Sequence, residues 1–302
     1  MVCALLASLC YALASVLQHR AAITQPDHHS LRLGLLGRLV RHPQWVVGIA
    51  CDGLGFALQF VALGHGSLVL VQPLLVCGLL FALPLGAWLA GTGMEARDWI
   101  GAVVVVAGLS VFLVVAAPGR GHADVDSWPL LIAAVGVTTG VILVAARGRS
   151  KRARAALLAT GAAVIYGLSA ALTKAVAHQL GADVVKMLSS WEVYTLVVVG
   201  VIGMVLAQSA FQSGPLDASL PMLTVVDPVA SIAIGALGLG EGIRTGIAPS
   251  TLETLGLVLM TVGVFMLSRS EAAHVAQEER VRDDGERDRR AALEEPLPPG
   301  DG

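Results

Sequence analysis

The feature that most constrains the fold is a long apolar stretch at residues 58–88, LQFVALGHGSLVLVQPLLVCGLLFALPLGAW. A Gly-His-Gly turn at residues 64–66 divides it into two runs, and the second run carries Gln72 and Pro73 among otherwise apolar residues. A helix of about twenty apolar residues matches the roughly 30 Å hydrocarbon core of a bilayer. The second run is therefore predicted to cross a membrane.

Gln72 and Pro73 require a polar environment inside that crossing. A proline has no amide hydrogen for the carbonyl four residues earlier, and hydrocarbon offers no water in its place. We therefore expect neighbouring protein or a water-filled cavity beside these two residues.

The same design returns at residues 211–239, FQSGPLDASLPMLTVVDPVASIAIGALGL. Two pairs are separated by 148 residues and three by 155, and their order is kept along the chain. These pairs are Gly66 with Gly214, Pro73 with Pro221, Tyr11 with Tyr166, Gly101 with Gly256, and Gly108 with Gly263. The pattern predicts an internal duplication.

Composition places the chain among polytopic membrane proteins. It is 55% hydrophobic and only 14% charged, and its mean hydropathy is +0.75, which excludes a water-soluble globule. Apolar run lengths predict nine membrane-spanning helices. They cover about residues 2–17, 44–63, 67–89, 99–117, 128–146, 155–177, 187–207, 216–239 and 251–267. The Arg-bearing piece at residues 31–43 is expected to lie on the membrane surface.

Lys and Arg predict the orientation, because they are retained on the cytoplasmic side. With nine spans, most of them gather on one face, and the loop at residues 147–154 is the most basic. This distribution predicts a protein of the bacterial plasma membrane with its N-terminus outside and its C-terminus in the cytoplasm.

The predicted fold is all-α, with two inverted repeats arranged 4+1+4. Residues 1–117 form the first repeat and residues 155–268 the second. Residues 118–154 supply a joining helix and a basic cytoplasmic loop, which turns the second repeat over relative to the first. Residues 269–302 carry many charges of both signs and are expected to form a disordered cytoplasmic tail.

Two carboxyl groups fall near the predicted midplane of the membrane. They belong to Asp52 in the second span and Asp227 in the eighth. A charge at the centre of a helix costs roughly 3 kcal/mol on insertion, so such a residue faces a cavity, finds a partner or carries a proton. One interpretation is a site that binds a proton or cation. The other is a neutral carboxyl hydrogen-bonded to a neighbouring helix.

Further polar residues and helix breaks accompany these carboxyls. Paired breaks in equivalent helices indicate a central binding site, and nearby amides and phenols can contact a solute. The alternative is packing without chemical importance. The binding candidates are Gln59, Gln72, Tyr11 and Tyr166, and the paired breaks are Pro73 and Pro221.

Two charged residues near the outer ends of consecutive spans, Lys174 and Glu192, are expected to form a structural ion pair rather than a gate. Glu241, at the outer end of the eighth span, is expected to cap a helix or pair with Arg244.

The sequence has no nucleotide-binding loop, nucleophile elbow or zinc-binding helix, so we expect neither an enzyme nor a cofactor, and no nucleic-acid partner. His19, His28 and His29 are interpreted as solvated loop residues rather than a metal site. A GxxxG motif, Gly136 and Gly140 in the joining helix, fits close helix packing within the chain or in a homodimer.

The first half, ALGHGSLVLVQPLLVCGLLFALPLGAWL followed by DWIGAVVVVAGLSVFLVV, resembles the drug/metabolite transporter superfamily with its EamA-like repeats. The second copy, AFQSGPLDASLPMLTVVDPVASIAIGALGLGE before ETLGLVLMTVGVFML, is still more similar, with Glu241 at the place of the family's loop glutamate. Nine spans and one proline in each repeat are similar to the NIPA-type magnesium transporter branch. The chain departs from the common ten-span pattern at residues 31–43, and Glu95 matches the family glutamate only loosely.

The resemblance implies a secondary transporter that moves a small solute or an ion across the lipid bilayer by alternating access, coupled to a proton or cation. A magnesium or divalent-cation carrier is the alternative within transport, although two deep carboxylates are few for Mg²⁺. A non-transporting membrane scaffold or sensor that acts through its tail is the alternative of another class.

Overall fold

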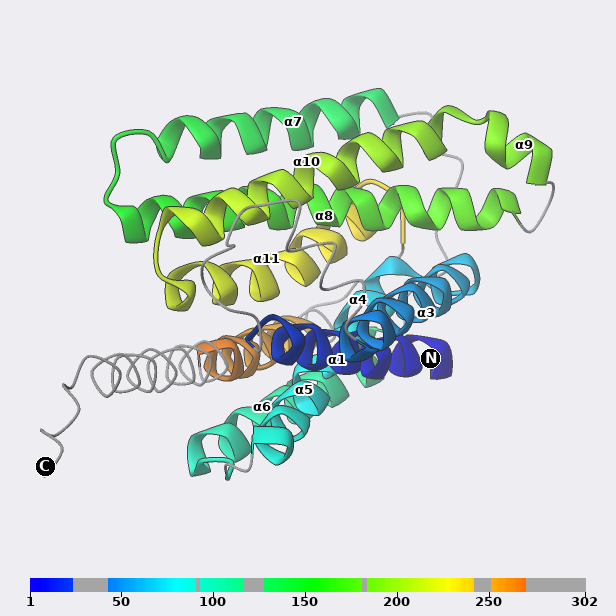
Figure 1. The fold of residues 1–302 in the computed structure, drawn as a ribbon. Helices are drawn as coiled ribbons and strands as arrows, with labels where there is room; N and C mark the ends of the chain where they lie inside the picture. The colour runs from blue at the N-terminus through cyan, green and yellow to red at the C-terminus, as the bar shows by residue number, and fades with distance from the viewer. Residues whose placement is uncertain (24–42, 91–92, 117–127, 181–183, 242–250, 270–302) are drawn as a thin grey trace, which may run out of the picture.

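The computed structural model describes residues 1–23, 43–90, 93–116, 128–180, 184–241 and 251–269, and its regular elements there are helices (Figure 1). The expectations for residues 31–43, His28, His29, Arg244 and the tail after residue 269 lie outside the described residues. The helices are α1 (Val2–Ile23), α3 (Pro43–His65), α4 (Leu68–Leu75), α5 (Cys77–Ala90), α6 (Ala96–Ala116), α7 (Trp128–Ala145), α8 (Lys151–Leu180), α9 (Val184–Ser189), α10 (Trp191–Ser213), α11 (Leu216–Leu237), and a C-terminal helix, Thr251–Arg269.

Eight helical segments of the described chain are long and apolar enough to cross a membrane, with α4 and α5 counted together as Leu68–Leu89. The apolar part of α1, Val2–Gln18, is shorter. Many of their outward side chains are large and apolar, as at Val103 and Leu130, which are 66% and 72% exposed. Contact of such an apolar surface with water is unfavourable, whereas contact with lipid is not. The prediction of an all-α, multi-pass membrane protein is confirmed.

Two predicted spans differ in detail from the helices. The span predicted at residues 67–89 consists of two helices that meet at Val76, three residues after Pro73, which cannot donate a helical hydrogen bond. The span predicted to begin at Met187 begins instead at Trp191. Ser190 has an extended backbone there, with φ −80° and ψ 144°, and separates α10 from the short helix α9.

The helices gather in two groups, with α7, α8, α10 and α11 on one side and α1, α3, α5 and α6 on the other (Figure 1). The long helix α8 packs against α7, α10 and α11 within its group. Its buried face is built largely of Ala and Gly, which lets these neighbours approach closely. Contacts of α3 with α8 and of α4 with α11 join the two groups.

Glycines pair α6 with the C-terminal helix in a reciprocal way. A Cβ added to Gly108 would lie 2.8 Å from the Gly256 carbonyl oxygen and still closer to the Met260 amide. A Cβ added to Gly263 would lie 2.6 Å from the amide nitrogen of Val105. Gly108 and Gly263 are separated by 155 residues, and so are Val105 and Met260. Gly108 therefore lies against Met260, and Gly263, which is equivalent to Gly108, lies against Val105, which is equivalent to Met260.

The equivalent tyrosines show a second matched contact. The Tyr11 ring lies 3.0 Å from a Cβ built on Gly55 in α3, and the Tyr166 ring lies 2.6 Å from one built on Gly203 in α10. Gly55 and Gly203 are separated by 148 residues, as are Gly66 and Gly214. Each tyrosine thus packs on a glycine at the same place in its own half of the chain.

We predict that Gly108→Ala destabilises the protein by about 1–3 kcal/mol, because the added methyl group overlaps backbone atoms that cannot rotate away. Thermal unfolding in detergent micelles measures this loss. Gly136→Ala in α7 is the control, since its added Cβ meets nothing within 4 Å. Equal melting temperatures for the two variants would contradict the close approach of α6 and the C-terminal helix.

Candidate functional site

The six polar candidates from the sequence line one cavity of about 570 Å³. They come from five helices spread over residues 2–237, so the tertiary fold brings them together. The candidates are Tyr11 of α1, Asp52 and Gln59 of α3, Gln72 of α4, Tyr166 of α8 and Asp227 of α11. The cavity therefore lies where the two groups of helices meet.

Hydrogen bonds fix several of these side chains. The Tyr11 hydroxyl donates to Gln59 Oε1 at 2.6 Å, which holds that amide against the cavity wall. The Ser231 hydroxyl, one helical turn after Asp227, donates to Asp227 Oδ1 at 3.4 Å. The two carboxyls differ in access, because Asp52 is exposed whereas Asp227 is half-buried.

Three further wall residues on α8 were not singled out from the sequence. Ser169, Ala170 and Thr173 line the cavity with Tyr166, and the four follow the spacing of one helical face. This spacing could identify the other wall residues from the sequence only if Tyr166 were already known to face the cavity. The Thr173 hydroxyl donates to the Ser169 carbonyl at 2.8 Å, so it is held within its own helix.

The prolines lie near the cavity in different ways. Pro73 and Pro221 are buried inside α4 and α11 but are not among the residues that line it. Pro228 does line it, together with Thr224 four residues earlier. Because a proline has no amide hydrogen, Pro228 leaves the Thr224 carbonyl without its usual helical partner. The Thr224 hydroxyl lies 2.5 Å from Ser268 Oγ, which joins α11 to the C-terminal helix.

The ionisable groups of the cavity wall are acidic or phenolic. Among the described residues that line it, two are Asp, two are Tyr, and none is Lys, Arg or His. A cleft lined by one sign of charge attracts the opposite sign when its groups ionise. The wall can therefore hold a proton or a cation together with a polar solute. In the described ranges no group of three His, Cys, Asp or Glu side chains is placed to hold a metal ion.

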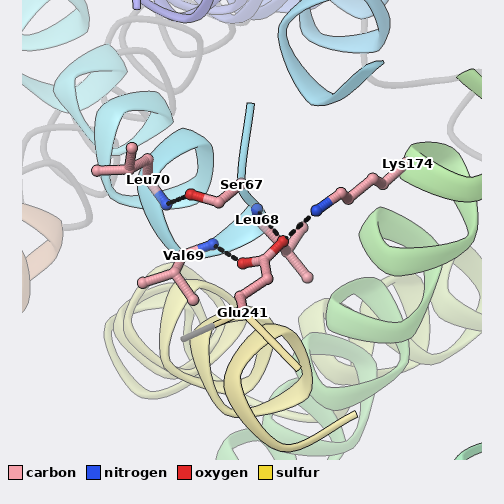
Figure 2. A network of polar contacts seen from close by, with 6 residues as sticks. All are labelled: Ser67, Leu68, Val69, Leu70, Lys174 and Glu241. Atoms are coloured by element: carbon pink, nitrogen blue, oxygen red, sulfur yellow. Dashed lines mark hydrogen bonds and ion pairs between the residues drawn. The ribbon is translucent and has the colours of Figure 1, made fainter. Parts of the chain in front are cut away.

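A second polar cluster, which we call the Glu241 network, consists of Glu241, Lys174 and the start of α4 at residues 67–70 (Figure 2). Glu241 Oε1 accepts the Leu68 amide at 2.6 Å and is ion-paired with Lys174, and Oε2 accepts the Val69 amide at 2.8 Å. Ser67 Oγ accepts the amide of Leu70 at 3.3 Å. The first three amides of α4 are thus satisfied, two of them by a residue more than 170 positions away.

This network corrects one expectation and bears out another. Lys174 is ion-paired with Glu241, not with the predicted partner Glu192, which lies in the first turn of α10. Glu241 does cap a helix, but the helix belongs to the other half of the chain. Both members of the pair are buried, with Glu241 1% and Lys174 6% exposed. Sequence reasoning missed the pairing because two residues that are distant in the sequence and meet only in the tertiary structure leave no local pattern.

The segment GALGLGE explains how Glu241 reaches that place. The Gly238 and Leu239 amides both donate to the Ile234 carbonyl, which ends α11. Gly240 has a φ of +61°, a conformation that glycine adopts readily, and the Glu241 amide returns to the Gly235 carbonyl at 3.0 Å. A Cβ on Gly235 would lie 2.7 Å from Glu241 Oε2, so the missing side chain leaves space for the carboxylate.

The chain is similar to an uncharacterized protein of Corynebacterium glutamicum. The two are 32% identical over 274 residues, which cover 88% of this chain and 93% of that protein. The chain belongs to the same family as that protein. No model of a known protein family matches the chain, and no solved structure matches it.

We predict that Lys174→Met lowers the free energy of unfolding by about 3–5 kcal/mol, because it leaves the Glu241 carboxylate buried without its counter-charge. Denaturation in mixed micelles measures the loss. Lys151→Met is the control, since Lys151 is exposed at the start of α8. A loss no larger than that of the control would show that the ion pair is not important for stability.

Proposed function

We propose that the protein is a secondary transporter of a small solute, coupled to a proton or cation and working by alternating access. The observation that carries the proposal is the convergence of Asp52, Asp227 and four other polar side chains on one cavity among apolar helices. A lipid-embedded protein that only needed stability would gain nothing from two carboxyls there, because each is costly in a low dielectric. The resemblance to the drug/metabolite transporter superfamily agrees with this reading.

The two halves of the chain would form inverted repeats, with α1 as a ninth crossing and α7 as the joining helix. The reciprocal glycine contacts support this, because exchanged contacts are what a two-fold axis between equivalent elements produces. The matched packing of Tyr11 and Tyr166 supports it too. Two equivalent halves can exchange conformations around a fixed cavity, so that the cavity opens first to one face and then to the other.

Asp52 and Asp227 would carry the proton or cation. Asp227 is half-buried and receives the Ser231 hydroxyl, so it can alternate between a proton and a bound cation in a partly dry environment. Asp52 is more accessible and would exchange its ion with water more readily. Gln59, Gln72 and the two tyrosines would contact the solute through amide and phenol groups.

The basic residues between α7 and α8 support an orientation in the membrane. Arg147, Arg149, Lys151 and Arg154 are exposed in or next to this turn, where α7 ends and α8 begins. Lys and Arg at the ends of membrane helices are retained in the cytoplasm. We therefore propose a plasma membrane protein whose basic turn and C-terminus are cytoplasmic and whose N-terminus is outside.

A magnesium carrier is the second candidate. The wall of the cavity offers carboxyl and amide oxygens, the ligand type that Mg²⁺ prefers, and its volume of about 570 Å³ has room for an ion that keeps several waters. Such a carrier would move the ion without an accompanying proton.

The deciding experiment reconstitutes the purified protein in liposomes that contain a pH-sensitive dye and a Mg²⁺-sensitive dye. The outer solution then receives Mg²⁺, organic amines and amino acids in turn. We expect a substrate-dependent proton flux that Asp227→Asn reduces to background, because the amide has nearly the shape of the carboxyl but cannot carry the proton. Glu192→Gln, outside the cavity, is the matched control and should keep the flux.

Other outcomes decide against this reading. An unchanged flux in Asp227→Asn would reassign this carboxyl to packing. Mg²⁺ entry without proton movement would favour the magnesium carrier. Absence of flux with every compound would favour a membrane scaffold or sensor.

A further inference from the structure

The Glu241 network lies at one end of the cavity. On α8, Lys174 directly follows Thr173, a residue of the cavity wall. On α4, Leu68 precedes the wall residue Gln72 by one helical turn. On the third segment, Glu241 follows the end of α11, which carries Asp227 on the wall. Each segment thus runs from the wall to the network, on the side away from the basic turn before α8.

The network joins the two halves of the chain rather than parts of one half. Leu68 and Val69 belong to the first half, whereas Lys174 and Glu241 belong to the second (Figure 2). The carboxylate takes both amides and the ammonium group at once. It cannot move away from α4 without leaving both amides unpaired, so these two hydrogen bonds form or break together.

Both sides of this contact are bounded by breaks between helices or by a turn. Helix α4 is only eight residues long, with the turn at Gly66 and Ser67 before it and the junction at Val76 after it. Glu241 lies beyond Gly240, whose φ of +61° ends a glycine turn. A short helix and a carboxylate on a glycine turn can separate without unfolding the long helices around them.

We propose that Glu241, held by Lys174 against the first amides of α4, closes this end of the cavity and leaves α4 when the cavity opens to that side. This role rests on the transport function proposed above. It makes Glu241 a positioning residue that acts through α4 and not a residue that contacts the solute.

Thiol labelling tests the closure without any substrate. Cys3, Cys10, Cys51 and Cys77 are first replaced by Ser, and Thr173→Cys then places one thiol on the wall beside Lys174. A membrane-impermeant maleimide is applied to vesicles from either face. We expect slow labelling from the Glu241 side. Glu241→Gln should speed it by about tenfold, the change expected when an open state rises from about 1% to about 10% of molecules.

Exchange of the two charges separates a closure on α4 from an ordinary ion pair. The double variant Lys174→Glu/Glu241→Lys keeps an ion pair with its two charges exchanged. A lysine at position 241, however, cannot accept hydrogen bonds from the Leu68 and Val69 amides. We expect fast labelling of position 173 in this double variant and slow labelling in Lys174→Arg. Slow labelling in the double variant would overturn the role of α4.

A buried thiol at the far end of α8 controls for general unfolding. Ala159→Cys replaces a residue with no exposed surface that packs near Ala210, and it should stay unlabelled in Glu241→Gln. If it reacts, the milder Gly235→Ala decides, because its added Cβ would lie 2.7 Å from Glu241 Oε2, closer than it would lie to Val69 Cγ2 or Leu68 Cβ, at 3.1 and 3.2 Å. An unchanged rate at position 173 in the folded variant would overturn the closure and leave the transport proposal intact. Faster labelling at position 173 in a protein that moves no solute would support the closure and argue against the transport proposal.

Discussion

The structure depends on one constraint, which is that backbone amides at a helix break inside a membrane protein need partners from the protein itself. The helical structure is interrupted between α3 and α4. The first amides of α4 therefore have no carbonyl acceptor in a preceding helical turn. Ser67 satisfies one of them and the Glu241 carboxylate satisfies two. Because Glu241 comes from the far half of the chain, this local requirement also holds the two halves together.

The cavity follows from the same physics. Polar side chains cannot face lipid at low cost, so those of several helices turn toward one another. Asp52 and Gln72, from the neighbouring helices α3 and α4, line one cavity with Asp227 from the far half of the chain. The concentration of polar groups in one place is what makes a binding site the natural interpretation of residues that would otherwise only lower stability.

Glycine determines how closely the helices approach. Gly108 and Gly263 allow backbone contact between α6 and the C-terminal helix, and Gly235 leaves space for the Glu241 carboxylate. In lipid, apolar side chains gain little by leaving their surroundings, so close packing and polar contacts must supply the specificity between helices. Substitutions at these glycines therefore test the fold more directly than substitutions at exposed leucines.

The sequence by itself determined the crossings and the candidate residues, because hydrophobic length and isolated polar groups are local properties. Most predicted spans agree with the helices, and Asp52, Gln59 and Asp227 were found as exceptions within apolar runs. The tertiary structure alone decided which polar groups meet. It paired Lys174 with Glu241, placed that carboxylate on α4 and gathered the wall around one cavity, since partners separated by many turns of helix leave no periodic trace in the sequence.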